Sequence, residues 1–345
     1  MPSVTSGKVL VTGANGFIAL WVVKTFLEKG FSVRGTVRSE AKVHHLKETF
    51  KSFGDKLEVV VVEDITKDGA FDEAVKGIDA IEHTASPFHF NATDPQELIV
   101  PAVAGTVGVL KSALKYGTNV KRITVLSSCA AVLEVLPNPK NFSEEDWAKA
   151  AIQEIEEKGK EASVSSTYRA SKTLAEKAAW DFVKEHKGEL KWDLVVLNPP
   201  YVFGPTLHEV ASVSSLNTSS SHWYQFVLEQ VAGNDFLASE GSCYVDVRDL
   251  ALAHVYALEK EAAAGNRFIV CAAAFKWQDI VNSARKFTTV SAGNLTYKPE
   301  NAVHMITYDT SKAAKILGMK YLSLDETTKA ILDDFKEKGF WPKKN

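Results

Sequence analysis

Short apolar runs alternate with longer amphipathic stretches along most of the chain. The runs stand at residues 9–11, 32–37, 57–62, 80–81, 123–126, 194–197 and 267–270. After the first run, apolar residues recur at helical spacing from Ile18 to Leu27, and the pattern ends at Gly30. Runs that are apolar at nearly every position are typical of parallel strands covered by helices on both faces. The alternation therefore predicts an α/β fold built on a doubly wound parallel sheet.

Three stretches interrupt this alternation. Residues 137–166 are polar and charged, with Ser143-x-x-Asp146 as a possible helix start. Residues 204–241 hold a run of Ser, Thr and Asn and then a helical pattern. From Phe275 onward we expect short helices and one strand, closing with an amphipathic helix. The last two stretches are expected to form a small lobe, and residues 244–271 to return to the main sheet between them.

A glycine-containing segment joins the first expected strand to the first helix. Gly13 permits a tight turn, Gly16 lets the backbone approach a pyrophosphate, and Ala19 allows close packing of helix on strand. Unpaired N–H groups at the helix start attract an anion. The segment predicts a Rossmann dinucleotide-binding loop whose contacts are Gly13, Asn15, Gly16, Phe17 and Ile18. We expect residues 1–204 and 244–272 to form the dinucleotide-binding domain, and residues 205–243 and 273–345 the smaller substrate-binding lobe.

The end of the second run indicates which dinucleotide is bound. Folds that prefer NAD usually place an acidic residue there, but this chain has Thr36. Arg38 and Lys42 follow, and both suit a 2′-phosphate. We therefore expect NADPH as the cofactor. Asp64 is expected to accept a hydrogen bond from the adenine amino group while Ile65 packs on the ring. Small residues after the fourth run are expected where the backbone passes close to the cofactor: Thr84, Ala85 and Ser86.

Composition narrows the functional classes. The 345 residues carry a net charge of −3, which gives no reason to expect nucleic acid or an anionic membrane as partner. The three cysteines are widely spaced, so neither a disulfide framework nor a metal site is expected. No signal region precedes the first strand, and no apolar run reaches the roughly 20 residues of a membrane helix. These features favour a cytoplasmic protein with a small-molecule partner, as a monomer or a homodimer.

Tyr168 and Lys172 lie four residues apart in a helical pattern and therefore on one helix face. A nearby ammonium stabilises a phenolate, which makes the tyrosine a usable acid–base group. This pairing is common by chance. Ser128 ends the fifth strand, at the sheet edge where such folds bind ligands, and its hydroxyl would polarise a carbonyl. The conjunction with the loop at Gly13 predicts a catalytic trio, although the sequence does not separate Ser127 from Ser128.

The chain resembles the extended short-chain dehydrogenases/reductases, in particular fungal NADPH-dependent aldehyde, methylglyoxal and ketone reductases related to dihydroflavonol reductases. The resemblance covers nearly the whole chain. It is carried by the motifs at residues 11–19, 38–42, 62–65, 83–88, 126–128, 168–172, 198–205, 216–219 and 244–249. It implies that Ser128, Tyr168 and Lys172 are catalytic, and that Tyr168 and Lys172 also contact the cofactor. It further implies cofactor contacts for Pro199, Val202 and Ser219.

The resemblance implies a carbonyl reductase that converts aldehydes and ketones, including α-keto compounds or aryl ketones, to alcohols by hydride transfer, with Tyr168 as proton donor. Aromatic residues near the expected cleft would bind apolar or aromatic substrates: Phe88, Phe90, Tyr201, Trp223 and Phe226. Two alternatives remain at this stage. One is a sugar-nucleotide epimerase or dehydratase on the same scaffold, and the other is a non-catalytic dinucleotide-sensing protein.

Overall fold

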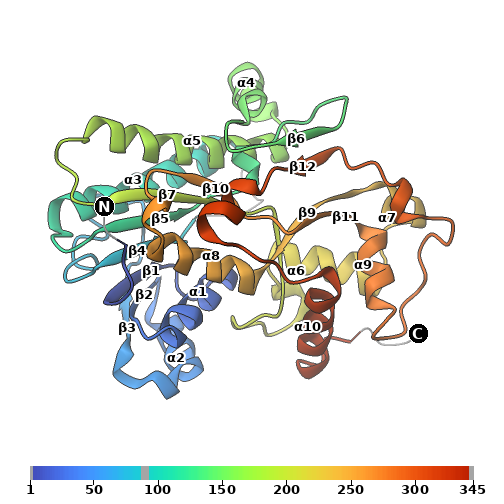
Figure 1. Cartoon of the computed structure of the whole chain (residues 1–345), viewed down its shortest axis with the longest axis horizontal. Helices are drawn as coiled ribbons and strands as arrows, with labels where there is room; N and C mark the ends of the chain where they lie inside the picture. Colours follow the sequence, from blue (N-terminus) through green and yellow to red (C-terminus); the bar gives the residue numbers. More distant parts are fainter. Residues whose placement is uncertain (1–2, 87–92, 342–345) are drawn as a thin grey trace.

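The computed structural model describes residues 3–86 and 93–341, and its centre is a seven-stranded sheet (Figure 1). The strand order is β10-β7-β5-β4-β1-β2-β3, and every neighbouring pair is parallel. The strands are β1 (Lys8–Thr12), β2 (Ser32–Val37), β3 (Leu57–Val61), β4 (Ala80–His83), β5 (Arg122–Leu126), β7 (Asp193–Asn198) and β10 (Arg267–Ile269). Each of the seven apolar runs forms one of these strands, which confirms the predicted doubly wound sheet.

Helices cover both faces of the sheet, because its strands are apolar on both sides. On one face lie α1 (Phe17–Glu28), α2 (Glu40–Thr49) and α8 (Val247–Glu259), which pack on inward side chains such as Val9 and Val11. On the other face lie α3 (Gln96–Tyr116) and α5 (Val164–Glu185), which pack on Leu10 and Ile123. In Figure 1 the two groups stand above and below the sheet. Neighbouring residues of β1 therefore serve two separate cores.

Helix α3 has a composition that the sequence reading did not anticipate. With 21 residues, the helix is long and apolar enough to cross a membrane when only its length and composition are considered. Half of its most apolar stretch is buried inside the protein, where Val109, Leu110 and Ala113 join the core beneath α5. The apolar character of α3 is accounted for by this packing.

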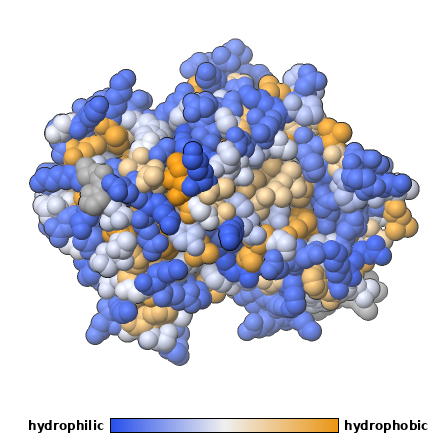
Figure 2. All heavy atoms as spheres, in the orientation of Figure 1, coloured by the Kyte–Doolittle hydropathy of each residue, from blue (hydrophilic) through white to orange (hydrophobic). Residues whose placement is uncertain are grey.

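A second, three-stranded sheet lies beside the first, with the order β11-β9-β8. It consists of β8 (Tyr201–Phe203), β9 (Gly241–Asp246) and β11 (Ala273–Lys276). Around it lie α6 (Thr218–Trp223), α7 (Asn234–Ser239), α9 (Trp277–Ala284) and α10 (Leu324–Glu337). The expectation that the chain returns to the main sheet from residue 244 is wrong for β9, since only α8 and β10 do so. In Figure 2 this face of the protein is mostly hydrophilic, with apolar residues gathered near its middle.

The polar insertion at 137–166 also differs from the expectation. It contributes β6 (Lys140–Phe142), which pairs with β12 (Ile306–Tyr308), and α4 (Lys149–Lys158). No helix begins at Ser143, so Asp146 does not cap one there. Its Oδ2 instead accepts from the Ser143 backbone N–H at 2.8 Å in a turn, and α4 begins three residues later. The remaining short helices span Lys51–Lys56, Cys129–Ala131, Gly159–Glu161, Val213–Ser215, Tyr224–Glu229, Glu261–Ala263, Pro299–Asn301 and Ala313–Leu317.

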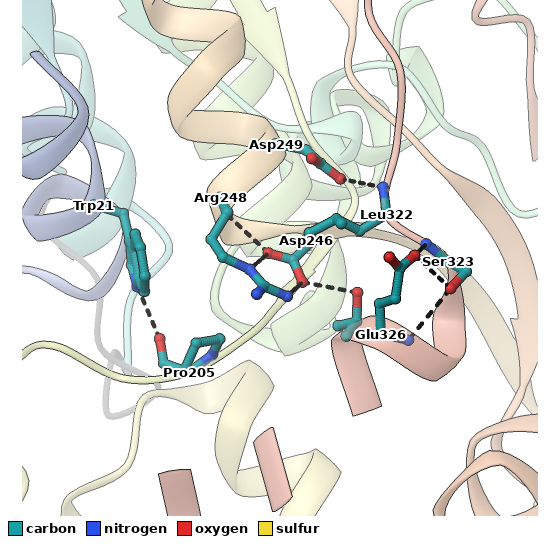
Figure 3. Close-up of polar contacts among 9 residues, drawn as sticks. Trp21, Pro205, Asp246, Arg248, Asp249, Leu322, Ser323 and Glu326 are labelled. Atoms are coloured by element: carbon teal, nitrogen blue, oxygen red, sulfur yellow. Dashed lines mark hydrogen bonds and ion pairs between the residues drawn. The ribbon is translucent and has the colours of Figure 1, made fainter. Parts of the chain in front are cut away.

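Two carboxylates at the start of α8 attach the C-terminal part of the chain (Figure 3). Asp246 is fully buried and accepts from Arg248 Nη2 at 2.7 Å and from Thr327 Oγ1, on α10, at 2.8 Å. Asp249 Oδ2 accepts from the Leu322 backbone N–H at 2.8 Å. Hydrogen bonds to charged acceptors are stronger than neutral ones. Helix α8 thus packs on the main sheet, and the residues at its start hold α10 and the segment before it.

Asp249 should make the folding stability fall as the pH rises from about 4 to about 6. Burial raises the pKa of its carboxyl to about 6, so the folded state holds a proton that the unfolded state has already lost. We expect Asp249→Asn to remove this slope and to raise stability at neutral pH, by roughly 3 kcal/mol at most. Urea unfolding at several pH values measures it, and parallel pH profiles for both proteins would contradict it.

Candidate active site

The candidate site lies at the carboxyl edge of the main sheet, where the loops after β1, β4, β5 and β7 meet. In the loop after β1, Gly13 has φ +65, and a Cβ there would lie 3.1 Å from Ala85 Cα, in the loop after β4. Glycine is required for both reasons. Gly16 precedes α1 with no side-chain cap, which leaves the N–H groups of that helix end open to an anion. These features fit the phosphates of a bound dinucleotide.

Thr12 holds the two loops together, a role that the sequence reading missed. Its buried Oγ1 accepts from the backbone N–H groups of Thr84, at 3.1 Å, and Ala85, at 3.0 Å. It also lies 3.0 Å from Nδ1 of the buried His83. The signal available in the sequence was a threonine ending an apolar strand, which has no specificity by itself. The hydroxyl satisfies backbone donors that would otherwise be buried without a partner.

Thr36, at the end of β2, explains the missing acidic residue. Its Oγ1 accepts from the Gly13 backbone N–H at 3.1 Å, and its carbonyl accepts from Ala14 N at 2.8 Å. Arg38, just after it, is exposed. Lys42, in the first turn of α2, forms a 2.9 Å ion pair with Glu209 of the segment after β8. Both cations therefore follow the strand end at which Thr36 contacts the loop at Gly13. Lys42 is already paired with Glu209.

The residues expected at the adenine lie after β3. Asp64 Oδ1 accepts from the backbone and the hydroxyl of Thr66, at 2.9 and 2.6 Å, and these bonds lower the pKa of the carboxyl. Ile65 is half-buried against Gly105 of α3, where an added Cβ would lie 2.9 Å from Ile65 Cδ1. A side chain at position 105 would therefore force Ile65 Cδ1 to move.

Ser128 and Tyr168 come from different elements and form a hydrogen bond. Ser128 follows β5 and its Oγ also accepts from Ala130 N at 3.1 Å. Ser127, in contrast, is buried, and its hydroxyl donates to Glu176 Oε2 at 2.6 Å. This geometry separates the two serines, which the sequence did not. It favours Ser128 as the residue in contact with the reacting group.

Tyr168 and Lys172 lie one turn apart on α5, with Lys172 Nζ 6.0 Å from the centre of the Tyr168 ring. Burial raises the pKa of the Tyr168 hydroxyl, and the hydrogen bond with Ser128 opposes that effect. Burial lowers the pKa of Lys172 to about 8. Lys172 Nζ donates to Ser86 Oγ at 2.9 Å. The trio and the loop after β4 therefore meet at one place.

The other expected cofactor residues lie in the segments that follow β1 and β7. Pro199 lies beside Ser128, since its carbonyl accepts from Cys129 N at 2.8 Å. Val202, in β8, is buried in the same apolar cluster as Phe17. Ser219 lies in α6 and is half-buried. Asn15 and Ile18 are half-buried at the start of α1.

The aromatic residues expected at the substrate separate into two groups. Tyr201 is close enough to Tyr168 to raise the pKa of its hydroxyl, and Tyr201 Oη lies 3.3 Å from His222 Nδ1. Phe226 contacts Trp277 at a ring separation of 4.8 Å. Trp223 is 1% exposed and packs on Phe335, so it is a core residue and not a pocket wall. Phe88 and Phe90 lie outside the described residues. His222 and Trp277, which contact Tyr201 and Phe226, were not among the residues that the sequence predicted.

This chain matches known proteins over nearly its whole length. The model of the NAD dependent epimerase/dehydratase family matches residues 9–272. Ketoreductase azaE of Aspergillus niger is 38% identical over 92% of this chain and 94% of its own length. NADPH-dependent methylglyoxal reductase GRE2 of Saccharomyces cerevisiae is 38% identical over 92% and 95%. The crystal structure of yeast methylglyoxal/isovaleraldehyde reductase Gre2 complexed with NADPH superposes with a TM-score of 0.84 at 34% identity, covering 96% of this chain and 99% of that one.

Removing the Thr12 hydroxyl should destabilise the site loops. In Thr12→Val the half-buried backbone N–H groups of Thr84 and Ala85 lose their acceptor, and we expect a loss of about 1 to 3 kcal/mol in the free energy of unfolding. Thr12→Ser keeps the acceptor and is the matched control, with an expected loss of about 1 kcal/mol. Urea denaturation measures both. A loss in Thr12→Ser as large as or larger than that in Thr12→Val would contradict the dominant role of the hydroxyl.

Proposed function

This chain belongs to the NAD dependent epimerase/dehydratase family, and on that premise we propose that it is an NADPH-dependent carbonyl reductase that converts aldehydes and ketones to alcohols. The observation that carries the proposal is the meeting of Ser128, Tyr168 and Lys172 at the loop after β4, which itself packs on the loop at Gly13. The relatives named as a ketoreductase and a methylglyoxal reductase support the same class of reaction.

The cofactor would lie along the carboxyl edge of the sheet. The open N–H groups at the start of α1 would bind its pyrophosphate, and Arg38 and Lys42 would bind the 2′-phosphate. Lys42 would exchange its ion pair with Glu209 for that phosphate. When bound, NADPH supplies the hydride for the carbonyl carbon. The yeast structure that superposes on this chain holds NADPH, which supports this assignment.

Ser128 and Tyr168 would bind the carbonyl oxygen between them. Because the raised pKa keeps the Tyr168 hydroxyl protonated at neutral pH, it can donate a hydrogen bond to the oxygen and then the proton itself. Ser128 Oγ would donate a second hydrogen bond to the oxygen, which stabilises the charge that develops there. Lys172, positively charged below a pH of about 8, would stabilise the resulting phenolate.

The substrate wall is proposed to consist of Tyr201, His222, Phe226 and Trp277. These rings favour medium-sized apolar or aromatic carbonyl compounds, such as aryl ketones and α-keto esters. A sugar nucleotide, in contrast, would need polar and cationic groups to bind its sugar and its diphosphate. NADPH consumption with a panel of aldehydes, α-keto esters, aryl ketones and one sugar nucleotide tests the class. Purified protein that carries tightly bound NAD would favour an epimerase or dehydratase.

We further propose a cytoplasmic enzyme, since its three cysteines are all buried and free, as suits a reducing compartment. The proposed division is a cofactor domain at 1–204 and 244–272 and a substrate lobe at 205–243 and 273–345. The second sheet draws strands from both parts, since β9 pairs with β8 on one side and with β11 on the other. A monomer and a homodimer are both compatible with this division.

Tyr168→Phe should lower kcat by a factor on the order of 100 to 10,000, because the proton donor is lost while the ring remains. We expect the Kd for NADPH to stay within about threefold, since the ring keeps its packing. Stopped-flow turnover and fluorescence titration measure the two quantities. Retention of most of the turnover with normal NADPH binding would remove Tyr168 from the role of proton donor.

Arg38→Ala and Lys42→Ala should each raise the KM for NADPH by a factor on the order of 10 to 100 and leave the KM for NADH unchanged. Each loses a charge-assisted hydrogen bond worth about 1.5 to 3 kcal/mol, which only the 2′-phosphate can accept. Lys47→Ala, at the far end of the same helix, is the control for net charge. An equal loss with both cofactors would contradict the assignment.

A further inference from the structure

Helix α5 carries a third functional side chain below Tyr168 and Lys172. Glu176 lies one turn beyond Lys172 on the same helix face and is 1% exposed. Its Oε2 accepts from Ser127 Oγ at 2.6 Å and from Asn198 Nδ2 at 2.8 Å. Its Oε1 lies 2.7 Å from Arg267 Nε in an ion pair. One carboxylate thus joins the helix to residues at the ends of β5 and β7 and to β10.

The ion pair is itself shielded from solvent. The Arg267 guanidinium lies 3.7 Å from the centre of the Trp147 ring, and its Nη1 donates to the carbonyls of Glu144, at 3.0 Å, and Asp146, at 2.9 Å. Desolvating two charges costs roughly as much as their attraction returns, so a buried ion pair is weak evidence for a role in stability. Apolar side chains would pack this position without that cost. The pair therefore calls for an explanation other than stability, such as a fixed arrangement of the groups that it touches.

Two of the groups that Glu176 touches, Ser127 and Asn198, bear directly on Ser128. Ser127 is its chain neighbour. Asn198 uses the amide that binds Glu176 to donate also to the Ser128 carbonyl, at 3.1 Å. The next backbone N–H, of Cys129, donates to the Pro199 carbonyl at 2.8 Å. The loop that carries Ser128 is therefore tied to α5, which carries Tyr168, through Glu176.

We propose that Glu176, held by Arg267, is a positioning residue of carbonyl reduction that fixes the Ser128 hydroxyl relative to Tyr168 and Lys172. The inference rests on the function proposed above. Glu176 does not touch the substrate oxygen, because its carboxylate is enclosed by Ser127, Asn198 and Arg267. It acts by keeping two hydroxyl groups from separate elements at the spacing that binds one oxygen atom. Displacement of a reacting group by about 1 Å lowers rates by a factor on the order of 100.

Glu176→Gln tests the proposal, because it keeps the shape of the side chain while one acceptor oxygen becomes an NH₂ group that faces other donors. We expect kcat to fall by a factor on the order of 10 to 100. The Kd for NADPH should stay within about threefold, since Glu176 lies away from the loop at Gly13. Ser127→Ala removes a single hydrogen bond of the same carboxylate and should lower kcat by a smaller factor, about three- to tenfold.

A double-mutant cycle separates positioning from general damage. If Glu176 acts through Ser128, the change Glu176→Gln made in a Ser128→Ala background should lower kcat by less than about threefold. If Glu176 only stabilises the fold, the two effects on kcat should multiply. Should Glu176→Gln fail to fold, the same cycle is run with Ser127→Ala, which leaves the carboxylate and its ion pair in place.

The other ends of β5 and β7 offer a matched control. Arg122, which is fully buried, donates to Asp193 Oδ1 from Nε at 2.5 Å and to Oδ2 from Nη2 at 3.0 Å. Asp193→Asn disturbs a buried ion pair between the same two strands, away from the carboxyl edge. We expect it to lower the melting temperature while kcat stays within about twofold.

The outcomes divide as follows. A drop in kcat for Glu176→Gln that disappears in the Ser128→Ala background supports the proposal. Multiplying effects, or an unchanged kcat in Glu176→Gln and in Ser127→Ala, overturns it while the reductase function stands. A wild-type protein that reduces no carbonyl compound of the panel with NADPH overturns the proposed function, and the positioning role falls with it.

Discussion

The parallel pairing of seven strands brings together the loops that form the candidate site. Parallel strands end at the same edge, so the loops after β1, β4, β5 and β7 meet there although they lie far apart in the chain. Most of the connections then cross the sheet through a helix, although the one from β3 to β4 consists of turns. The helices cover both faces and so require strands that are apolar on both sides. The apolar runs that form the sheet and the polar residues that follow them are therefore parts of one requirement.

Polar groups at such an edge lie among buried side chains, and each must find a partner. Thr12 accepts from the loop after β4, Thr36 accepts from the loop after β1, and Glu176 accepts from Ser127 and Asn198. In each case an unsatisfied donor would cost more than a single hydrogen bond contributes. The partners therefore fix the loops in one arrangement. Networks of fully paired polar groups favour one arrangement of the segments that they join.

Burial at this edge of the sheet favours the neutral forms of the two titratable groups of the trio. Burial disfavours the charged form of both Tyr168 and Lys172, and so raises the pKa of the phenol and lowers that of the ammonium. The hydrogen bond with Ser128 works against burial at Tyr168. A bound cofactor and substrate would complete the surroundings of both groups. Positions of the hydroxyl groups, set by the loop at Ser128 and by α5, therefore matter as much as their intrinsic acidities.

The sequence by itself determined the main sheet, the loop at Gly13 and the pairing of Tyr168 with Lys172, because each depends on local spacing. Apolar runs, glycines before a helix and residues four apart keep their meaning wherever the chain folds. It did not determine that β9 joins a second sheet, since strand partners depend on contacts between distant segments. Tertiary structure alone separated Ser127 from Ser128 and put Trp223 in the core. It also brought Thr12, Glu176 and His222 into contact with partners from other elements. A single polar residue in a sequence carries no record of what it will face, and packing decides that.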